Sequence, residues 1–173
     1  MAKTSEYLLI DGYNIVFAWP ELKKLAEYSL ATARQRLCDI LCDYQGTASF
    51  HTILVFDAHN VEQNPGSIEA YHNITVVFTK TAETADHYIE RASRVLGKRD
   101  RVTVATSDLL EQIIILSSGA RAVSAADLWS EILHARERVR MRYLAGRPVK
   151  NNPLEGLLDP ETAKALDAMR YGK

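Results

Sequence analysis

Acidic residues follow four apolar runs of this chain, at the points where those runs end. They are Asp11, after residues 7–10; Asp57, after 53–56; Glu83 and Asp86, after 74–78; and Asp108, just past 102–105. If the runs are parallel strands, these ends meet at one edge of a sheet, where open α/β sheets bind ligands. Carboxylates from distant parts of the sequence would then share one pocket.

Carboxylates gathered in this way need a compensating cation. Neighbouring strands lie about 4.8 Å apart, and two like charges near that distance repel by about 3 to 4 kcal/mol at an effective dielectric constant of about 20. Sites made of carboxylates and water select Mg²⁺ or Mn²⁺, which can activate a water molecule and stabilise the leaving oxygen in phosphodiester hydrolysis. Cys38 and Cys42, with no His pair beside them, are a weak zinc signal.

Each acidic residue also has a structural interpretation. An Asp at a strand end is a common turn former, and Asp108 with Glu111 three residues later fits a helix cap. Glu83 and Asp86 could simply complement the dipole of the helix that they open. The joint occurrence of the acids favours a site more than any one of them does.

Polar and aromatic residues near the predicted edge also allow two interpretations. Asn14 could orient a water molecule or a phosphate through its amide, or it could form a tight turn with Gly12. His59, His87 and Tyr13 could contact bases or the scissile phosphate, but for each a structural role is favoured. Trp19 is more typical of a packed loop anchor than of a base-stacking platform.

Helical patterns lie between the apolar runs. They cover residues 29–44, 85–96, 109–116 and 124–145. The third is apolar almost all round, which predicts deep packing, and the fourth has an apolar stripe at Leu128, Ile132, Ala135 and Val139. Helices alternating with strands, including a weaker strand near 122–123, predict a three-layer α/β domain with a mainly parallel sheet.

Length and composition indicate one folded domain with a tail. We expect the domain to span residues 1–145 and a C-terminal tail, with a short helix that starts near Asp159, to span 146–173. No apolar run reaches the roughly 18 residues of a membrane helix, and no signal-like segment opens the chain, which predicts a cytoplasmic location. The net charge is −1, so nucleic-acid binding must rest on local charge.

Basic residues concentrate near the end of the predicted domain. Between residues 136 and 150 the chain has one acid, Glu137, against Arg136, Arg138, Arg140, Arg142, Arg147 and Lys150. These side chains could reach phosphates, of nucleic acid in general or of ribosomal RNA. The alternative is a solvated helix face, which needs no partner.

Four strings of residues contain the acids. They are Leu9-Ile10-Asp11-Gly12-Tyr13-Asn14 with Ala18-Trp19-Pro20; Val55-Phe56-Asp57-Ala58-His59; Phe78-Thr79-Lys80 with Glu83-Thr84-Ala85-Asp86; and Val104-Ala105-Thr106-Ser107-Asp108. In this order, over about residues 7–145, the strings resemble the patterns of the YacP-like NYN family, which are PIN-like bacterial ribonucleases.

The resemblance implies a PIN-like fold, a divalent-metal acidic site and endonucleolytic cleavage of RNA. It places the site at Asp11, Asp86 and Asp108 with Asn14 beside them, and extends with less support to two further acids, Asp57 and Glu83. Members of the family include ribosome-associated enzymes that cut messenger RNA during translation. Messenger RNA and the ribosome are therefore implied partners of a metal-dependent endoribonuclease.

Two other functions fit part of the pattern. An RNA- or ribosome-binding module that does not cut would bind through the basic segment in a salt-sensitive manner, although the intact acidic set argues against it. A phosphoacceptor switch domain would take up phosphate on Asp57 beside Mg²⁺. Such domains require paired acids after the first strand and a Lys at the end of the fifth. In this chain Asp11 is followed by Gly12, and the weak strand at 122–123 is followed by Ser124.

Overall fold

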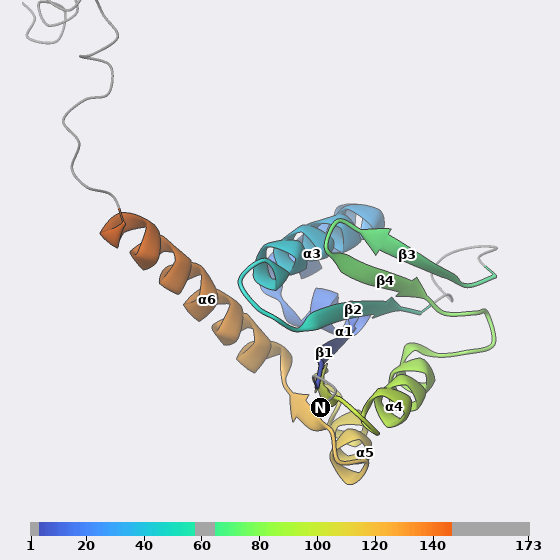
Figure 1. Ribbon diagram of the computed structural model, residues 1–173. Helices are drawn as coiled ribbons and strands as arrows, with labels where there is room; N and C mark the ends of the chain where they lie inside the picture. Colours follow the sequence, from blue (N-terminus) through green and yellow to red (C-terminus); the bar gives the residue numbers. More distant parts are fainter. Residues whose placement is uncertain (1–3, 58–64, 147–173) are drawn as a thin grey trace, which may run out of the picture. The chain divides into compact units, whose positions relative to one another are not determined.

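The computed structural model describes residues 4–57 and 65–146 (Figure 1). These residues form six strands and six helices. In chain order the elements are β1 (Glu6–Asp11), α1 (Gly12–Ala18), α2 (Pro20–Tyr28), α3 (Leu30–Gln45), β2 (His51–Phe56), β3 (Ser67–Tyr71), β4 (Ile74–Phe78), α4 (Ala85–Leu96), β5 (Arg101–Ala105), α5 (Leu109–Ser117), β6 (Arg121–Val123) and α6 (Ala125–Ala145).

The strands form one sheet in the order β3-β4-β2-β1-β5-β6. All neighbouring strands are parallel except β3 and β4, so the predicted α/β class and mainly parallel sheet are confirmed. From β1 the chain builds outward through β2 and β4, then returns across β1 to add β5 and β6 on the other side. The strand order therefore reverses beside β1, which is the position where open α/β sheets bind ligands.

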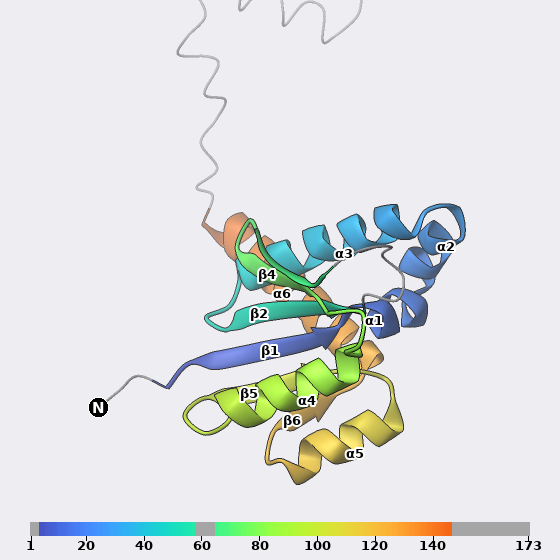
Figure 2. The same cartoon turned by 90° about the vertical axis from the view of Figure 1, so that its right-hand side faces the viewer.

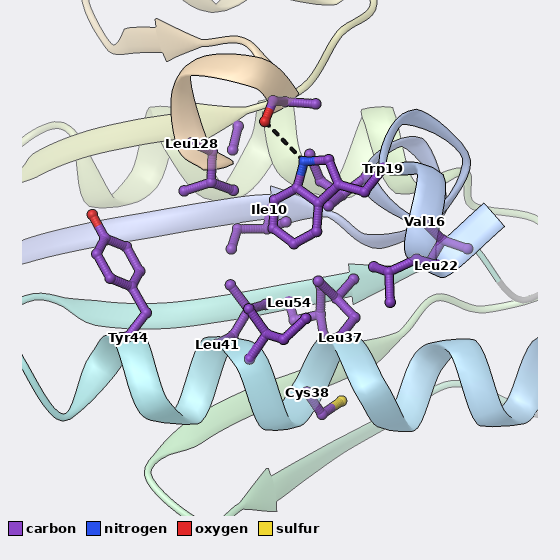
Figure 3. Packing of buried hydrophobic residues seen from close by; sticks show 14 of the residues in the cluster. Ile10, Val16, Trp19, Leu22, Leu37, Cys38, Leu41, Tyr44, Leu54 and Leu128 are labelled. Carbon is purple, nitrogen blue, oxygen red and sulfur yellow. Dashed lines mark hydrogen bonds between the residues drawn. The ribbon is translucent and has the colours of Figure 1, made fainter. Parts of the chain in front are cut away.

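Helices cover both faces of the sheet (Figure 2). Because side chains alternate along a strand, consecutive residues of β1 enter different cores. Ile10 packs with Leu54 of β2 and Leu41 of α3 on the face that α1, α2 and α3 cover (Figure 3). Leu9 packs with Ile89 of α4 and its neighbours on the opposite face. Both faces of β1 are thus buried, as its unbroken apolar run predicts.

Trp19 ties the start of the chain to the start of α6. Its indole N–H donates to the backbone oxygen of Ala125 over 2.9 Å (Figure 3). Its ring lies 4.8 Å from that of Trp129, between ring centres, and the residue is buried. The expectation of a packed anchor is confirmed.

Strand β3 is not expected from the sequence. Its residues Ser67 to Tyr71 mix polar and apolar types, and it pairs antiparallel with β4 at the edge of the sheet. An edge strand has a neighbour on one side only and leaves much of its surface in water, so its sequence lacks the apolar run that marks a central strand. The hairpin adds a sixth strand to the predicted sheet.

The prediction that residues 109–116 are deeply packed is wrong. Of α5, only Glu111 and Ile115 are buried, whereas Leu109, Leu110, Ile113, Ile114 and Leu116 are exposed. The helix packs through one side against β6 and α4, so apolar character all round does not mean burial all round. The stripe of α6 is likewise shorter than expected, because it ends at Ala135 and Val139 is 48% exposed.

The contacts divide the chain between Glu137 and Arg138, inside α6. The first unit holds the sheet, and the described part of the second consists of the last turns of α6 with Gly146. The predicted tail helix near Asp159 lies outside the described residues, and the boundary at residue 145 stays a prediction. None of the helices described is long and apolar enough to cross a membrane.

Candidate metal and active site

Asp11 lies where β1 passes directly into α1. It is the last residue of the strand and the N-cap of the helix, and its Oδ1 accepts the backbone N–H of Asn14 over 3.1 Å. A side chain at Gly12 would place its Cβ 2.4 Å from the Phe56 ring and 2.9 Å from the backbone oxygen of Val55. Glycine therefore lets the helix begin against β2, and this brings the Asp11 carboxyl to the sheet edge in a position that is 9% exposed.

Asp86 enters the same region from the first turn of α4. That helix begins at Ala85 because the Thr84 side chain caps it, accepting the backbone N–H of His87 over 3.3 Å. An acid at this position is favourable because the N-terminus is the positive end of the helix dipole. Asp86 is exposed.

Glu111 completes the group from the first turn of α5. Asp108 caps this helix, its Oδ1 accepting the backbone N–H groups of Leu110 and Glu111 over 2.8 and 3.3 Å. The backbone N–H of Asp108 donates to the Thr106 hydroxyl, so Glu111 does not fold back on it as it would in a capping box. Glu111 is only 5% exposed, and neither of its carboxylate oxygens has a hydrogen-bond partner among the residues described.

One carboxylate oxygen from each of Asp11, Asp86 and Glu111 lies within 4.8 Å of the other two. We call these three residues the acidic triad. They come from the end of β1 and the first turns of α4 and α5, which are far apart in the sequence. Oxygen ligands around a Mg²⁺ ion lie about 3 to 4 Å from one another, given metal–oxygen distances of about 2.1 Å. The triad therefore has nearly the spacing that one small divalent cation requires.

Burial and mutual repulsion raise the pKa values of all three triad carboxyls. Burial raises the pKa of Asp11 to about 6, with smaller contributions from the charges of Asp86, Asp57 and Asp108, while the hydrogen bond from Asn14 opposes the rise. Burial likewise raises the pKa of Glu111 to about 7, against a lowering effect of Thr106, and the neighbouring acids add to it. The pKa of Asp86 is also raised, first by burial and then by Asp108.

A cation fits this environment better than the protein groups alone do. A buried carboxylate without a partner is unfavourable, and nearly all buried polar groups in folded proteins have one. In Glu111 that partner is missing from the described residues, while two more carboxylates face the same point. Carboxylate oxygens without thiolate or imidazole ligands are the donor set of Mg²⁺ and Mn²⁺.

The chain matches the model of the YacP-like NYN domain over residues 8–171. It belongs to this family. It is 38% identical over 170 residues to the uncharacterized protein YacP of Bacillus subtilis (strain 168), covering 96% of this chain and 98% of that protein. The predicted family is thereby confirmed, and it supports a nuclease-like, RNA-related function.

The fold is also similar to that of solved structures of the Bacillus subtilis protein. The crystal structure of Rae1 (YacP) from Bacillus subtilis matches with a TM-score of 0.68 and 34% identity, over 96% of this chain and 95% of that one. A tryptophan-to-leucine mutant of the same Bacillus protein matches with a TM-score of 0.70 and 33% identity, over 95% and 99% of the two chains. The α/β fold of this NYN domain is therefore that of YacP.

Two further acids of this NYN domain, Asp57 and Asp108, lie beside the triad. Asp57 follows β2 and lines a cavity of about 460 Å³ together with Asp11 and Asp86. The charges of Asp57 and Asp108 raise the pKa values of Asp11 and Asp86. The Oδ1 of Asp108 accepts two backbone N–H groups. Asp108 does not belong to the acidic triad, whose carboxylate oxygens lie within 4.8 Å of one another. The metal-binding roles predicted for these two acids stay predictions.

Glu83 is not brought into the triad. Its carboxylate lies 2.8 Å from a guanidinium nitrogen of Arg91 and faces a neighbouring groove rather than the acidic cavity. An ion pair with a residue further along α4 satisfies this acid without a metal. The geometry gives no support to the metal-binding role predicted for Glu83.

Asn14 fixes the loop that precedes α5. Its side-chain oxygen accepts the backbone N–H of Ser107 over 2.7 Å, while its own backbone N–H donates to Asp11. The residue thus links the ends of β1 and β5, the two strands at which strand order reverses. A positioning role follows directly from these bonds, and the predicted contact with water or phosphate stays a prediction.

Glu111 is the residue that sequence reasoning misses. The spacing indicates only a partner in the cap of Asp108, and the residues around it are typical of an apolar helix. A usable signal is present, because Glu111 is the one charged residue among Leu109 to Ser117. A lone acid in an apolar helix next to a strand end is a candidate for a buried site.

The predicted RNA-binding arginines divide between the two units. Arg136 lies 4.0 Å from Asp43 in an ion pair and 5.9 Å from the centre of the Trp129 ring, so it is already engaged within the first unit. Arg138, Arg140 and Arg142 are exposed in the last turns of α6. Arg147, Lys150 and His59 lie outside the described residues. RNA contact by this segment stays a prediction.

Proposed function

We propose that this NYN domain is a divalent-metal-dependent endoribonuclease that hydrolyses phosphodiester bonds of RNA at the acidic triad. The observation that carries the proposal is the buried Glu111 carboxylate, which has no described protein partner and faces Asp11 and Asp86. Family membership supports RNA as the substrate class. The reversal of strand order beside β1 supports the location.

Each group of the site has a role in this proposal. Asp11, Asp86 and Glu111 would hold Mg²⁺ or Mn²⁺, and Asp57 adds negative charge that favours the cation. When bound, such an ion lowers the pKa of water and stabilises charge on the leaving oxygen. Asp108 and Asn14 act by holding α5 and the loop before it, so that Glu111 faces Asp11.

The proposal extends to the substrate and its setting. We take the RNA to be messenger RNA, cut in association with the translating ribosome in the cytoplasm, and the exposed arginines Arg138, Arg140 and Arg142 to contact phosphates. The likeness to the bacterial YacP family supports this part. Comparing cleavage of free RNA with cleavage of messenger RNA on translating ribosomes tests the role of the ribosome.

Cleavage is tested by mapping new RNA ends with purified protein. End-labelled RNA, and messenger RNA on translating ribosomes, are incubated with Mg²⁺, Mn²⁺ or EDTA. We expect metal-dependent ends in one or both substrates and a loss of at least about 100-fold in Asp86→Asn and Glu111→Gln, because each removes a ligand of the cation. Glu27→Gln, an exposed substitution on α2, is the matched control. Cleavage that persists in EDTA or in Asp86→Asn contradicts the mechanism.

A further inference from the structure

A groove of about 650 Å³ lies beside the first two turns of α4. Its floor includes Ile68 of β3 and Val77 of β4, which pair at the sheet edge, and one side is formed by α4. Further lining residues from the loop between β4 and α4, and from α4 itself, are Lys80, Glu83, His87, Tyr88 and Arg91. None of these residues belongs to the acidic triad.

The groove and the acidic cavity meet at the start of α4 and carry opposite charge. Thr84 and Asp86 line the cavity, while the residues just before and after them, Glu83 and His87, line the groove. The titratable lining of the cavity includes Asp11, Asp57 and Asp86 but no Lys, Arg or His among the described residues. The groove has Lys80, His87 and Arg91 against one described acid. A cation and a phosphate backbone would therefore occupy adjoining places.

One wall of the groove offers a flat face as well as charge. The guanidinium carbon of Arg91 lies 5.3 Å from the centre of the Tyr88 ring, and Tyr88 is half-buried. Arg91 is also paired with Glu83, and its side chain stays 63% exposed. A ring with a guanidinium beside it is the kind of surface on which unpaired bases stack.

The local backbone holds Lys80 at the end of the groove. The backbone N–H of Glu83 donates to the backbone oxygen of Lys80 over 2.8 Å, which closes a turn. Gly66 has a φ of +89°, and a Cβ there would lie 2.8 Å from Cγ of Lys80. Glycine at this position thus permits the Lys80 stem to lie against the chain that enters β3.

We propose that this groove binds single-stranded RNA on one side of the scissile phosphate, with Lys80 and Arg91 on phosphates and Tyr88 against a base. The inference rests on the proposed function, because it takes the adjoining triad as the place of cleavage. Bases of a duplex are hidden in the stack, whereas those of a single strand can lie on an aromatic wall. Glu83 then weakens RNA binding, because it pairs with Arg91, which would otherwise be free to contact a phosphate.

Binding is measured apart from cleavage, by fluorescence anisotropy in EDTA. The probes are a labelled single-stranded RNA of about 12 nucleotides and the same sequence as a blunt duplex. We expect the single strand to bind tighter. Lys80→Gln with Arg91→Gln should weaken it about tenfold or more and flatten its dependence on salt concentration, because two phosphate contacts are lost. Tyr88→Leu should weaken it about tenfold.

Glu83→Gln gives the sharpest readout, because binding should become several-fold tighter. A structural role for the Glu83–Arg91 pair would give no gain. Arg94→Gln removes the same charge from α4, where Arg94 pairs with Glu90 and does not line the groove, and should bind as wild type does. Circular dichroism melts confirm that each variant folds.

The outcomes separate the two proposals. If the groove variants bind RNA as wild type does, or the duplex binds as tightly as the single strand, the groove inference is wrong even where the protein cuts RNA. If the groove variants lose binding while no metal supports cleavage, the groove inference stands and the nuclease proposal fails.

Discussion

Glu111 keeps a carboxyl group in a buried position with two other acids facing it, and this arrangement works against the stability of the metal-free protein. An ordinary core would have an apolar residue there, like the Ile115 one turn later. The same burial makes the group useful once a cation arrives. Residues at binding sites are commonly kept at such a cost to stability.

The pH dependence of stability follows from the direction of this pKa shift. Because the pKa of Glu111 rises from 4.5 to about 7 on folding, the folded state binds the proton more tightly, and stability falls as pH rises through this window. In EDTA, the unfolding free energy of Glu111→Gln relative to wild type should increase by about 1 to 3 kcal/mol between about pH 4.5 and pH 8. Urea denaturation at both pH values measures it. A difference that does not change with pH contradicts the buried, proton-binding state of Glu111.

Metal binding should stabilise the fold through the same residues. A ligand at about 100 times its dissociation constant adds about 2.7 kcal/mol, or roughly 5 to 11 °C in melting temperature for a chain of this size. We expect Mn²⁺ or Mg²⁺ to raise the melting temperature of wild type and Glu27→Gln in this way. Asp11→Asn and Glu111→Gln should show little rise, and an equal rise in these two variants places the metal elsewhere.

At the level of elements, the junction of β1 with α1 depends on the absence of a side chain at Gly12. Gly12→Ala would force a Cβ into the Phe56 ring and the backbone oxygen of Val55. We expect a loss of about 1 to 3 kcal/mol in unfolding free energy, as for other overpacked cores. Gly46→Ala, at a helical φ of −62° with its nearest atoms at 3.4 Å, should change stability by less than about 1 kcal/mol. Chemical denaturation of both variants tests the difference.

The central elements are predictable from the sequence, and those at the margins are not. Residues 7–10 and 53–56 are largely buried in the sheet, so their apolar runs identify strands and their ends locate Asp11 and Asp57. The edge strand β3 has no such run. Apolar residues also fill the exposed side of α5, which conceals that its important residue is the acid Glu111. Sequence spacing predicts acids at one sheet edge but not the distances that separate Glu83 from the triad.

On the scale of the whole chain, the net charge of −1 hides a local separation of charge. Acids collect in the cavity at the end of β1, while Lys80, His87 and Arg91 collect in the groove beside it. Long-range attraction to RNA is therefore weak, and recognition rests on short-range contacts. The described basic residues of the last turns of α6 form a third region, in the second unit.

The central place of β1 has a consequence for synthesis of the protein. This strand precedes the other five described strands in the chain, yet it lies between β2 and β5, and its carboxylate at Asp11 meets Glu111 only after α5 has docked. Contacts between residues so distant in sequence form late in folding, because the connecting chain must first be ordered. A growing chain therefore has no complete acidic triad until most of the domain has been translated. The proposed nuclease would remain inactive toward RNA while its own N-terminal half is being made.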